Sequence, residues 1–300
     1  MRKVPLITGF LFFVGLFTLI FFIASQHNID VLNPQGIIAA KQRDLLFIAT
    51  LLMLIVVIPV FLLTFFIVWR YREDNKKAKY SPNWSNSNVL ETIWWMIPFV
   101  IIVILAVITW KSSHELDPYR ALNSEKKAIN IQVISLQWKW LFIYPDQKIA
   151  AVNYIRIPEK TPINFKVTSD APMNSFWIPS LGGQVYAMAG MSTKLHLEAD
   201  HKGTYRGVSA NISGKGFAGM KFKVESTSDA DFRQWSNETR RLSKSLDMPA
   251  YDELAKPSEN QTMQLFSLKQ ANLYDKVVMK YMARDSSSSG EENHNIHSGE

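Results

Sequence analysis

Two long runs of apolar residues, followed by a region of alternating polarity, divide this chain. Residues 45–69 carry no charge, and residues 89–110 carry a single acid, Glu91. About 20 apolar residues are enough to span a bilayer as a helix, so each run predicts a transmembrane helix. We therefore expect a two-helix membrane hairpin within residues 26–110.

The first 25 residues form a third apolar stretch. Arg2 and Lys3 precede it, and a charged start before an apolar centre is typical of a signal peptide. The stretch is also long enough to span a bilayer. Residues 1–25 therefore predict either a signal peptide that is removed or a signal anchor that is retained.

The segment between the two longer runs, residues 70–88, is rich in Lys and Arg. Short loops of this composition stay in the cytoplasm. This predicts that everything after residue 110 lies outside. In a bacterium, that places the C-terminal part on the periplasmic side of the plasma (inner) membrane, as part of a multi-pass protein.

From residue 111 the apolar positions alternate with polar ones, which is the period of a half-buried strand. The alternating positions are Ile129, Ile131, Val133, Trp138, Trp140, Phe142, Tyr144, Ile163, Phe165, Val167, Leu195, Leu197, Met220, Phe222 and Val224. Short strands separated by turn residues predict an antiparallel sandwich or barrel. We assign it to residues 111–227, with Trp138 and Trp140 as packing residues on one strand.

Residues 228–283 return to helical spacing, with aromatic residues at Phe232, Trp235, Tyr251, Phe266, Tyr274 and Tyr281. This predicts a small helical extension that packs its rings on another surface. Residues 284–300 are low in complexity and are expected to be disordered.

The composition excludes several kinds of functional site and narrows the possible partners. The chain has no cysteine, which excludes disulfides, thiolate metal sites and iron–sulfur clusters. Its net charge is +7, but no run of five or more basic residues occurs. A basic bias is expected of a membrane protein with cytoplasmic Lys and Arg. Membrane lipid is therefore the expected partner, and nucleic acid is not.

Residues 203–226 read as two strands joined by a Gly-rich loop, which at the end of a sandwich could hold a metal. However, Ser209, Asn211, Ser213 and Phe217 do not make a soft-metal site. Three methionines, Met188, Met191 and Met220, suggest a soft-metal cluster, but methionine more commonly fills gaps in a core.

Three motifs resemble subunit II of the haem–copper respiratory oxidases: QWKW at Gln137–Trp140, NSFWIPSLGGQVYAMAGM at Asn174–Met191 and GVSANISGKGFAGMKF at Gly207–Phe222. The resemblance implies a membrane-anchored all-β protein, in which two transmembrane helices precede a cupredoxin-like Greek-key β-sandwich. It also implies that the aromatic-rich extension is that of the quinol-oxidising members.

In the cytochrome c-oxidising branch of that family, a binuclear copper centre is held by two Cys, two His, a Met and a main-chain carbonyl. The corresponding positions here are Ser209 and Ser213 for the Cys, Asn174 and Phe217 for the His, Asn211 for the residue that supplies the carbonyl, and Met220 for the Met. Soft thiolates and imidazoles suit copper, and one thioether does not replace them. We expect no metal and no other cofactor in this chain.

The resemblance then implies subunit II of a bo-type ubiquinol oxidase of the aerobic respiratory chain. The complex would oxidise quinol, reduce O₂ to water and pump protons. The haems, the remaining copper and the quinol would be bound by subunit I, with which this chain and other subunits would assemble. This chain would carry no electrons and no catalytic residue. The alternative is a membrane-anchored degenerate cupredoxin that acts as an oxidase assembly or copper-handling module.

Glu91 is the residue most suggestive of chemistry. An acid within a membrane helix is costly and is a functional candidate. It also lies at the start of that helix, where an interfacial carboxylate is favoured by the helix dipole. The stretch ETIWWMIP, residues 91–98, resembles the family's second helix, which implies that Glu91 relays protons into subunit I.

Overall fold

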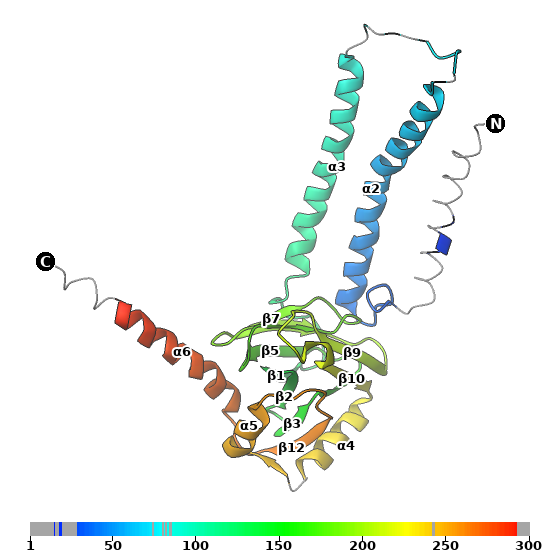
Figure 1. Ribbon diagram of the computed structural model, residues 1–300. Helices are drawn as coiled ribbons and strands as arrows, with labels where there is room; N and C mark the ends of the chain where they lie inside the picture. The colour runs from blue at the N-terminus through cyan, green and yellow to red at the C-terminus, as the bar shows by residue number, and fades with distance from the viewer. Residues whose placement is uncertain are drawn as a thin grey trace, which may run out of the picture. The chain divides into compact units, whose positions relative to one another are not determined.

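The computed structural model describes residues 29–292, except 74, 80, 82, 84–85 and 242–243, together with residues 15, 18 and 19 (Figure 1). The signal or anchor predicted for residues 1–25 lies almost wholly outside the described residues and stays a prediction. The chain divides into two units, one of residues 41–120 and one that combines residues 1–40 with 121–300.

The two predicted membrane helices are present as α2, Ile37–Arg70, and α3, Asn88–Glu115. Both are long and apolar enough to cross a membrane. α2 begins at Ile37 rather than at 45, because a few charged residues at a helix end do not interrupt helical backbone. The predicted start at 45 marked only the end of those charges.

The sandwich consists of two sheets. One has the strand order β11-β12-β3-β2-β1-β5-β8 and the other β4-β10-β9-β6-β7. The strands are β1 Ile129–Leu136, β2 Lys139–Tyr144, β3 Ile149–Val152, β4 Tyr154–Pro158, β5 Ile163–Ser169, β6 Asn174–Trp177, β7 Val185–Ala187, β8 Thr193–Leu197, β9 Gly203–Ser209, β10 Lys221–Thr227, β11 Ser245–Leu246 and β12 Gln264–Leu268. Most neighbours are antiparallel, as the alternating pattern predicted, but β1 with β5, β4 with β10 and β11 with β12 pair in parallel.

Aromatic rings fill the space between the sheets. Phe176 and Phe222 stack at a centroid distance of 5.3 Å, and Trp140 meets both edge-on at 5.5 and 5.9 Å. Offset and edge-to-face contacts of this kind add stability beyond the area that they bury. The period-two pattern therefore identified the inner faces of both sheets correctly.

The C-terminal extension adds helices α4 Asp229–Arg240, α5 Met248–Ala255 and α6 Leu273–Glu292. Within the extension, β12 pairs with β3 and β11 pairs with β12, so both strands join the first sheet. The sequence predicted a helical extension, whereas the observed extension contains both helices and strands. α6 also continues past the predicted boundary at 283. In Figure 1, α4 and α5 lie near β12.

The extension covers the outer face of the first sheet. Every residue of β2 is buried, so both of its faces are covered. The second apolar cluster consists of Ile134, Leu136, Leu141, Ile143, Ala150 and Val152 from the sheet with Leu246, Tyr251, Phe266, Leu273, Tyr274, Val277 and Val278 from the extension. The prediction that the aromatic residues pack on another surface is confirmed.

The segment that precedes the membrane hairpin is hydrogen-bonded to the sandwich. The Gln35 N–H donates to the Ser180 carbonyl at 2.7 Å, the Asp200 N–H to the Gln35 carbonyl at 2.8 Å, and the Ala39 N–H to the Leu181 carbonyl at 3.2 Å. The chain leaves this unit after residue 40 and returns at 121. The hairpin therefore begins and ends on the same side of any membrane that it spans.

Candidate functional site

The Gly-rich loop joins β9 to β10, as predicted. It spans residues 210–220 and contains a short 3-10 turn, Phe217–Gly219. The loop is closed at its base, where the Ser209 N–H donates to the Met220 carbonyl at 3.2 Å. Two adjacent antiparallel strands thus hold both ends of the loop at a fixed separation.

The copper-position residues are the six that align with the copper ligands: Asn174, Ser209, Asn211, Ser213, Phe217 and Met220. Hydrogen bonds bring three of them together. The Ser209 hydroxyl donates to Asn174 Oδ1 at 3.0 Å, because β9 and β6 are neighbouring strands. Asn174 Nδ2 donates to the Pro172 carbonyl at 2.8 Å, and Asn211 Nδ2 to the Met173 carbonyl at 2.9 Å. Amide and hydroxyl groups therefore fix one end of the sandwich.

The other three positions also have structural contacts. Met220 is 1% exposed and belongs to the core between the sheets. The half-buried Phe217 begins the 3-10 turn, and its N–H donates to the Gly214 carbonyl at 3.1 Å. The Ser213 carbonyl accepts a hydrogen bond from Trp138 Nε1 at 3.1 Å.

Trp138 does not belong to the strand on which it was expected. Its φ is +63°, in the left-handed region, and β2 begins one residue later. Its ring packs against Gly214 and Gly216, and a Cβ added to Gly216 would overlap the indole. The prediction for Trp140 as a core residue is confirmed, since that side chain is 0% exposed. Trp138 instead supports the loop.

The donor set of the loop does not fit a soft-metal centre. It offers amides, hydroxyls and one thioether, whereas copper sites use thiolate and imidazole. Within the described parts of residues 29–292, no group of three or more His, Asp or Glu could hold a metal. His196 lies on β8 and places its Nδ1 2.8 Å from Asn164 Oδ1 on the neighbouring strand. Of the three methionines, Met191 is 51% exposed, whereas Met220 is buried.

Glu91 lies in the first turn of α3, with an exposed side chain. Ser87 caps this helix, and its hydroxyl accepts from the Leu90 N–H at 3.5 Å. A carboxylate in this position is favoured by the partial positive charge at the helix N-terminus. The proposed relay of protons by Glu91 stays a prediction.

One buried carboxylate, that of Asp170, was not predicted from the sequence. The side chain of Asp170, at the end of β5, is only 2% exposed. It accepts hydrogen bonds from the hydroxyls of Tyr251 at 2.7 Å and Tyr281 at 2.6 Å, and from Lys280 Nζ at 2.7 Å. A single acid after a strand carries no recognisable signal, because its partners lie in helices far along the chain.

A second polar cluster attaches α4 to the sandwich. Arg156 donates to Tyr154 Oη at 2.8 Å and to Glu225 Oε2 at 3.0 Å, and its guanidinium lies 5.5 Å from the ring centroid of Trp235. The Tyr154 hydroxyl also donates to Glu225. The hydrogen bonds from Tyr154 and Arg156 hold the pKa of Glu225 below its usual value.

The structure thus defines a membrane-anchored, cupredoxin-like domain that lacks the ligands of a copper centre. Family models match along most of its length. Residues 36–111 match the transmembrane domain of cytochrome c oxidase subunit II, residues 147–227 its periplasmic domain, and residues 240–285 the aromatic-rich motif of the same oxidases.

Similar proteins carry a more specific name. Cytochrome bo(3) ubiquinol oxidase subunit 2 of Pseudomonas putida is 50% identical over 93% of this chain and 88% of its own length. The protein of that name from Pseudomonas aeruginosa is 50% identical over 85% and 77%. Among solved structures, the periplasmic domain of subunit II of cytochrome oxidase from Bradyrhizobium japonicum aligns at 20% identity and a TM-score of 0.37, over 40% of this chain and 96% of its own. The chain belongs to the family of the cytochrome bo(3) ubiquinol oxidase subunit 2 proteins.

Proposed function

We propose that this chain is the non-haem subunit II of a proton-pumping ubiquinol oxidase, in which it supports assembly and carries no electrons. One observation supports this most strongly: Asn174, Ser209 and Asn211, hydrogen-bonded to one another and to the carbonyls of Pro172 and Met173, occupy the place where the cytochrome c-oxidising branch holds copper. With no electron carrier in the sandwich, electrons from quinol enter the complex elsewhere.

The remaining parts of the proposal concern the surroundings of the chain. The haems and copper belong to subunit I, which binds the quinol and meets this chain in the bacterial inner membrane. The sandwich and its extension lie in the periplasm. The matched transmembrane and periplasmic family domains support this placement, as does a hairpin with both ends on one side.

Purification from native membranes tests the proposal. The chain is expected to co-purify with a haem-bearing subunit, and the preparation is expected to oxidise ubiquinol but not reduced cytochrome c. Copper analysis of the isolated outer domain is expected to give less than about 0.1 copper per chain, because the loop lacks soft ligands. Stoichiometric copper in that domain, or oxidation of cytochrome c, would contradict the proposal.

The alternative role as a copper-handling module is not favoured. Such a protein requires metal ligands, and the copper-position residues of the loop supply one thioether. The relatives that cover most of this chain are named as oxidase subunits. A copper-loaded chain recovered without a haem subunit would revive the alternative.

Glu91 is proposed to admit protons to the oxygen-reducing subunit. An acid at the end of a membrane helix is a candidate relay. Glu91→Gln is expected to slow steady-state oxygen reduction about tenfold or more, because an amide does not exchange its proton as a relay must. The matched control is Glu73→Gln, in the segment between the two helices. Wild-type turnover in a fully assembled Glu91→Gln complex would exclude the relay.

A further inference from the structure

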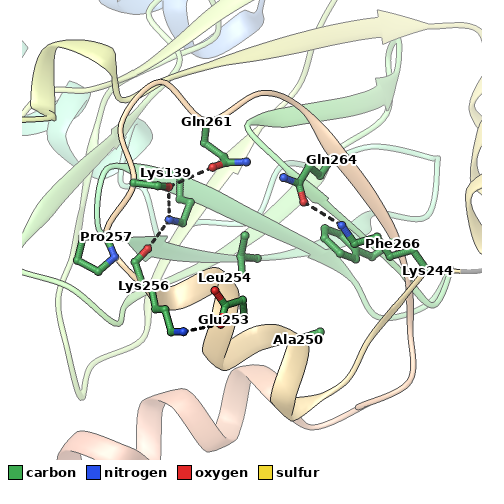
Figure 2. Close-up of a pocket in the computed structure, with 11 residues that line it drawn as sticks. Lys139, Lys244, Ala250, Glu253, Leu254, Lys256, Pro257, Gln261, Gln264 and Phe266 are labelled. Carbon is green, nitrogen blue, oxygen red and sulfur yellow. Dashed lines mark hydrogen bonds and ion pairs between the residues drawn. The ribbon is translucent and has the colours of Figure 1, made fainter.

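A cavity of about 610 Å³ lies between the first sheet and the C-terminal extension (Figure 2). Its walls come from α5, the loop that follows α5, β12, Lys139 of β2 and Lys244, which precedes β11. This volume is within the range of sites that bind small molecules. The cavity is separate from the loop at residues 210–220, so it needs an explanation of its own.

The floor of the cavity contains a buried ammonium group. Lys139 is 1% exposed, and its Nζ donates to the Lys256 carbonyl at 2.7 Å and to the Ser258 hydroxyl at 2.6 Å. Within the described residues, no carboxylate lies close enough to form an ion pair with it. An ammonium has three donors, so these two contacts leave one N–H uncommitted. Burial lowers the pKa of Lys139.

The contact with α5 accounts for only part of this arrangement. The Lys256 carbonyl is at the C-terminal cap of α5, and a cation is favoured at that end of a helix. This explains why Lys139 is tolerated in the interior. It does not explain the cavity beside it or the other cations on its rim.

The rim is also cationic. Lys244 Nζ lies 4.9 Å from the ring centroid of Phe266 and 3.4 Å from Gln264 Oε1 (Figure 2). Lys256 is paired with Glu253 at 2.5 Å. The lining therefore holds three lysines and one acid, which leaves it positively charged.

Apolar groups complete the lining. Ala250 and Leu254 of α5, Pro257 and the ring of Phe266 face the same space. A cavity with an apolar wall and a few convergent polar groups is the usual form of a small-molecule site.

We propose that this cavity binds a small anion with a short apolar group, of the phosphate-ester class, whose phosphate meets Lys139 and Lys244 and whose apolar group lies against Leu254 and Phe266. Lysine commonly binds phosphate as a point charge. The ligand is either a free phosphate ester or a phospholipid headgroup. This proposal holds whichever molecule donates electrons to the complex.

The first test uses the whole purified complex in detergent, with butyl phosphate as the probe. Lysine acylation followed by mass spectrometry reports which ammonium groups become protected. Lys244 and Lys256 are expected to be protected in a saturable way, whereas Lys215, whose side chain is 84% exposed outside the cavity, is not. No saturable protection up to about 10 mM would overturn the proposal.

Two variants make the test specific. Lys244→Gln is expected to raise the dissociation constant for butyl phosphate about tenfold, as read from protection of Lys256. Lys194→Gln, which removes an exposed cation from β8, is the matched control and is expected to change nothing. Equal effects of the two variants, or none from either, would contradict a site at this cavity.

Lys139→Met removes the floor cation and is expected to abolish protection in an assembled complex. Should that variant fail to assemble, Lys244→Gln decides the question alone. The source of the anion is tested in nanodiscs without added butyl phosphate. Protection of Lys244 by phosphatidylglycerol but not by phosphatidylcholine assigns a lipid headgroup, and protection by butyl phosphate alone assigns a free ester.

Discussion

The two buried polar regions of the sandwich differ in charge. At the loop end, neutral hydrogen bonds join the Ser209 hydroxyl to Asn174 Oδ1 and to the Asn211 carbonyl. At the junction with the extension, the buried groups are charged: Asp170 accepts from two tyrosines and a lysine, and Lys139 caps α5. Both regions order backbone that would otherwise be irregular.

The difference shows how each region responds to loss of a partner. A neutral hydrogen bond contributes about 1 kcal/mol net, whereas a hydrogen bond to a charged group contributes about 1.5–3 kcal/mol. Loss of one partner at the loop end should therefore cost little stability, which is consistent with ordinary polar residues at the copper-ligand positions. Loss of a partner at the junction should cost more stability, so the extension is an integral part of the fold.

The largest effect is expected from Asp170→Ala. It removes the charged acceptor of the buried Tyr251 hydroxyl and of Lys280, whose own side chain is 53% exposed, and the loss of these hydrogen bonds to a charged group costs about 3 kcal/mol. Hydrogen exchange of α5 and α6 in the assembled complex should then accelerate about a hundredfold.

Asp252→Asn, at an exposed position of α5, is the control and should leave exchange unchanged. Asp170→Asn retains the shape and one acceptor, so it should have an intermediate effect. Unchanged protection of α6 in Asp170→Ala would show that the charged junction does not hold the extension.

Gly216→Ala comes next. The added methyl group overlaps the Trp138 indole, so the ring must move away from the Ser213 carbonyl, at about 1–3 kcal/mol. Exchange of residues 210–220 should accelerate about tenfold or more. Lys215→Ala, beside it but exposed, should have little effect. Equal exchange rates in the two variants would show that the Trp138 ring does not keep the loop ordered.

The smallest effect is expected at Glu225, whose pKa is lowered by hydrogen bonds from Tyr154 and Arg156. A carboxyl with a lowered pKa stabilises the folded state above its unfolded pKa, near 4.5, and that contribution is lost as pH falls through the folded value. Glu225→Gln should therefore weaken the attachment of α4 by at most about 1 kcal/mol at pH 7. The ratio of exchange rates between variant and wild type should approach one as pH falls below the folded pKa of Glu225. A ratio independent of pH would exclude a contribution from the ionised carboxylate.

The sequence predicted elements where the evidence is local. Both membrane helices follow from the length of their apolar runs, and the inner faces of the sandwich follow from the alternation of apolar and polar residues. The loop was located between its two strands. Trp138 was misplaced because alternation of aromatic residues continues across a backbone position with positive φ, which the pattern does not reveal.

What the sequence did not predict depends on contacts between distant residues. β12 is a short strand that exists because β3 offers a free edge. Lys139 occupies a polar position in an alternating strand, where an exposed side chain is the normal expectation. It is buried because the loop after α5 covers it, and the copper-position network likewise requires β6 and β9 to be neighbours.

The hydrogen bonds of Gln35 also constrain biosynthesis. This residue emerges early from the ribosome, but its acceptor at Ser180 is synthesised only after both hydrophobic helices and β1 to β6. Closing so long a loop carries an entropic cost. The segment around Gln35 therefore cannot reach its place on the sandwich until the chain beyond β6 has been made.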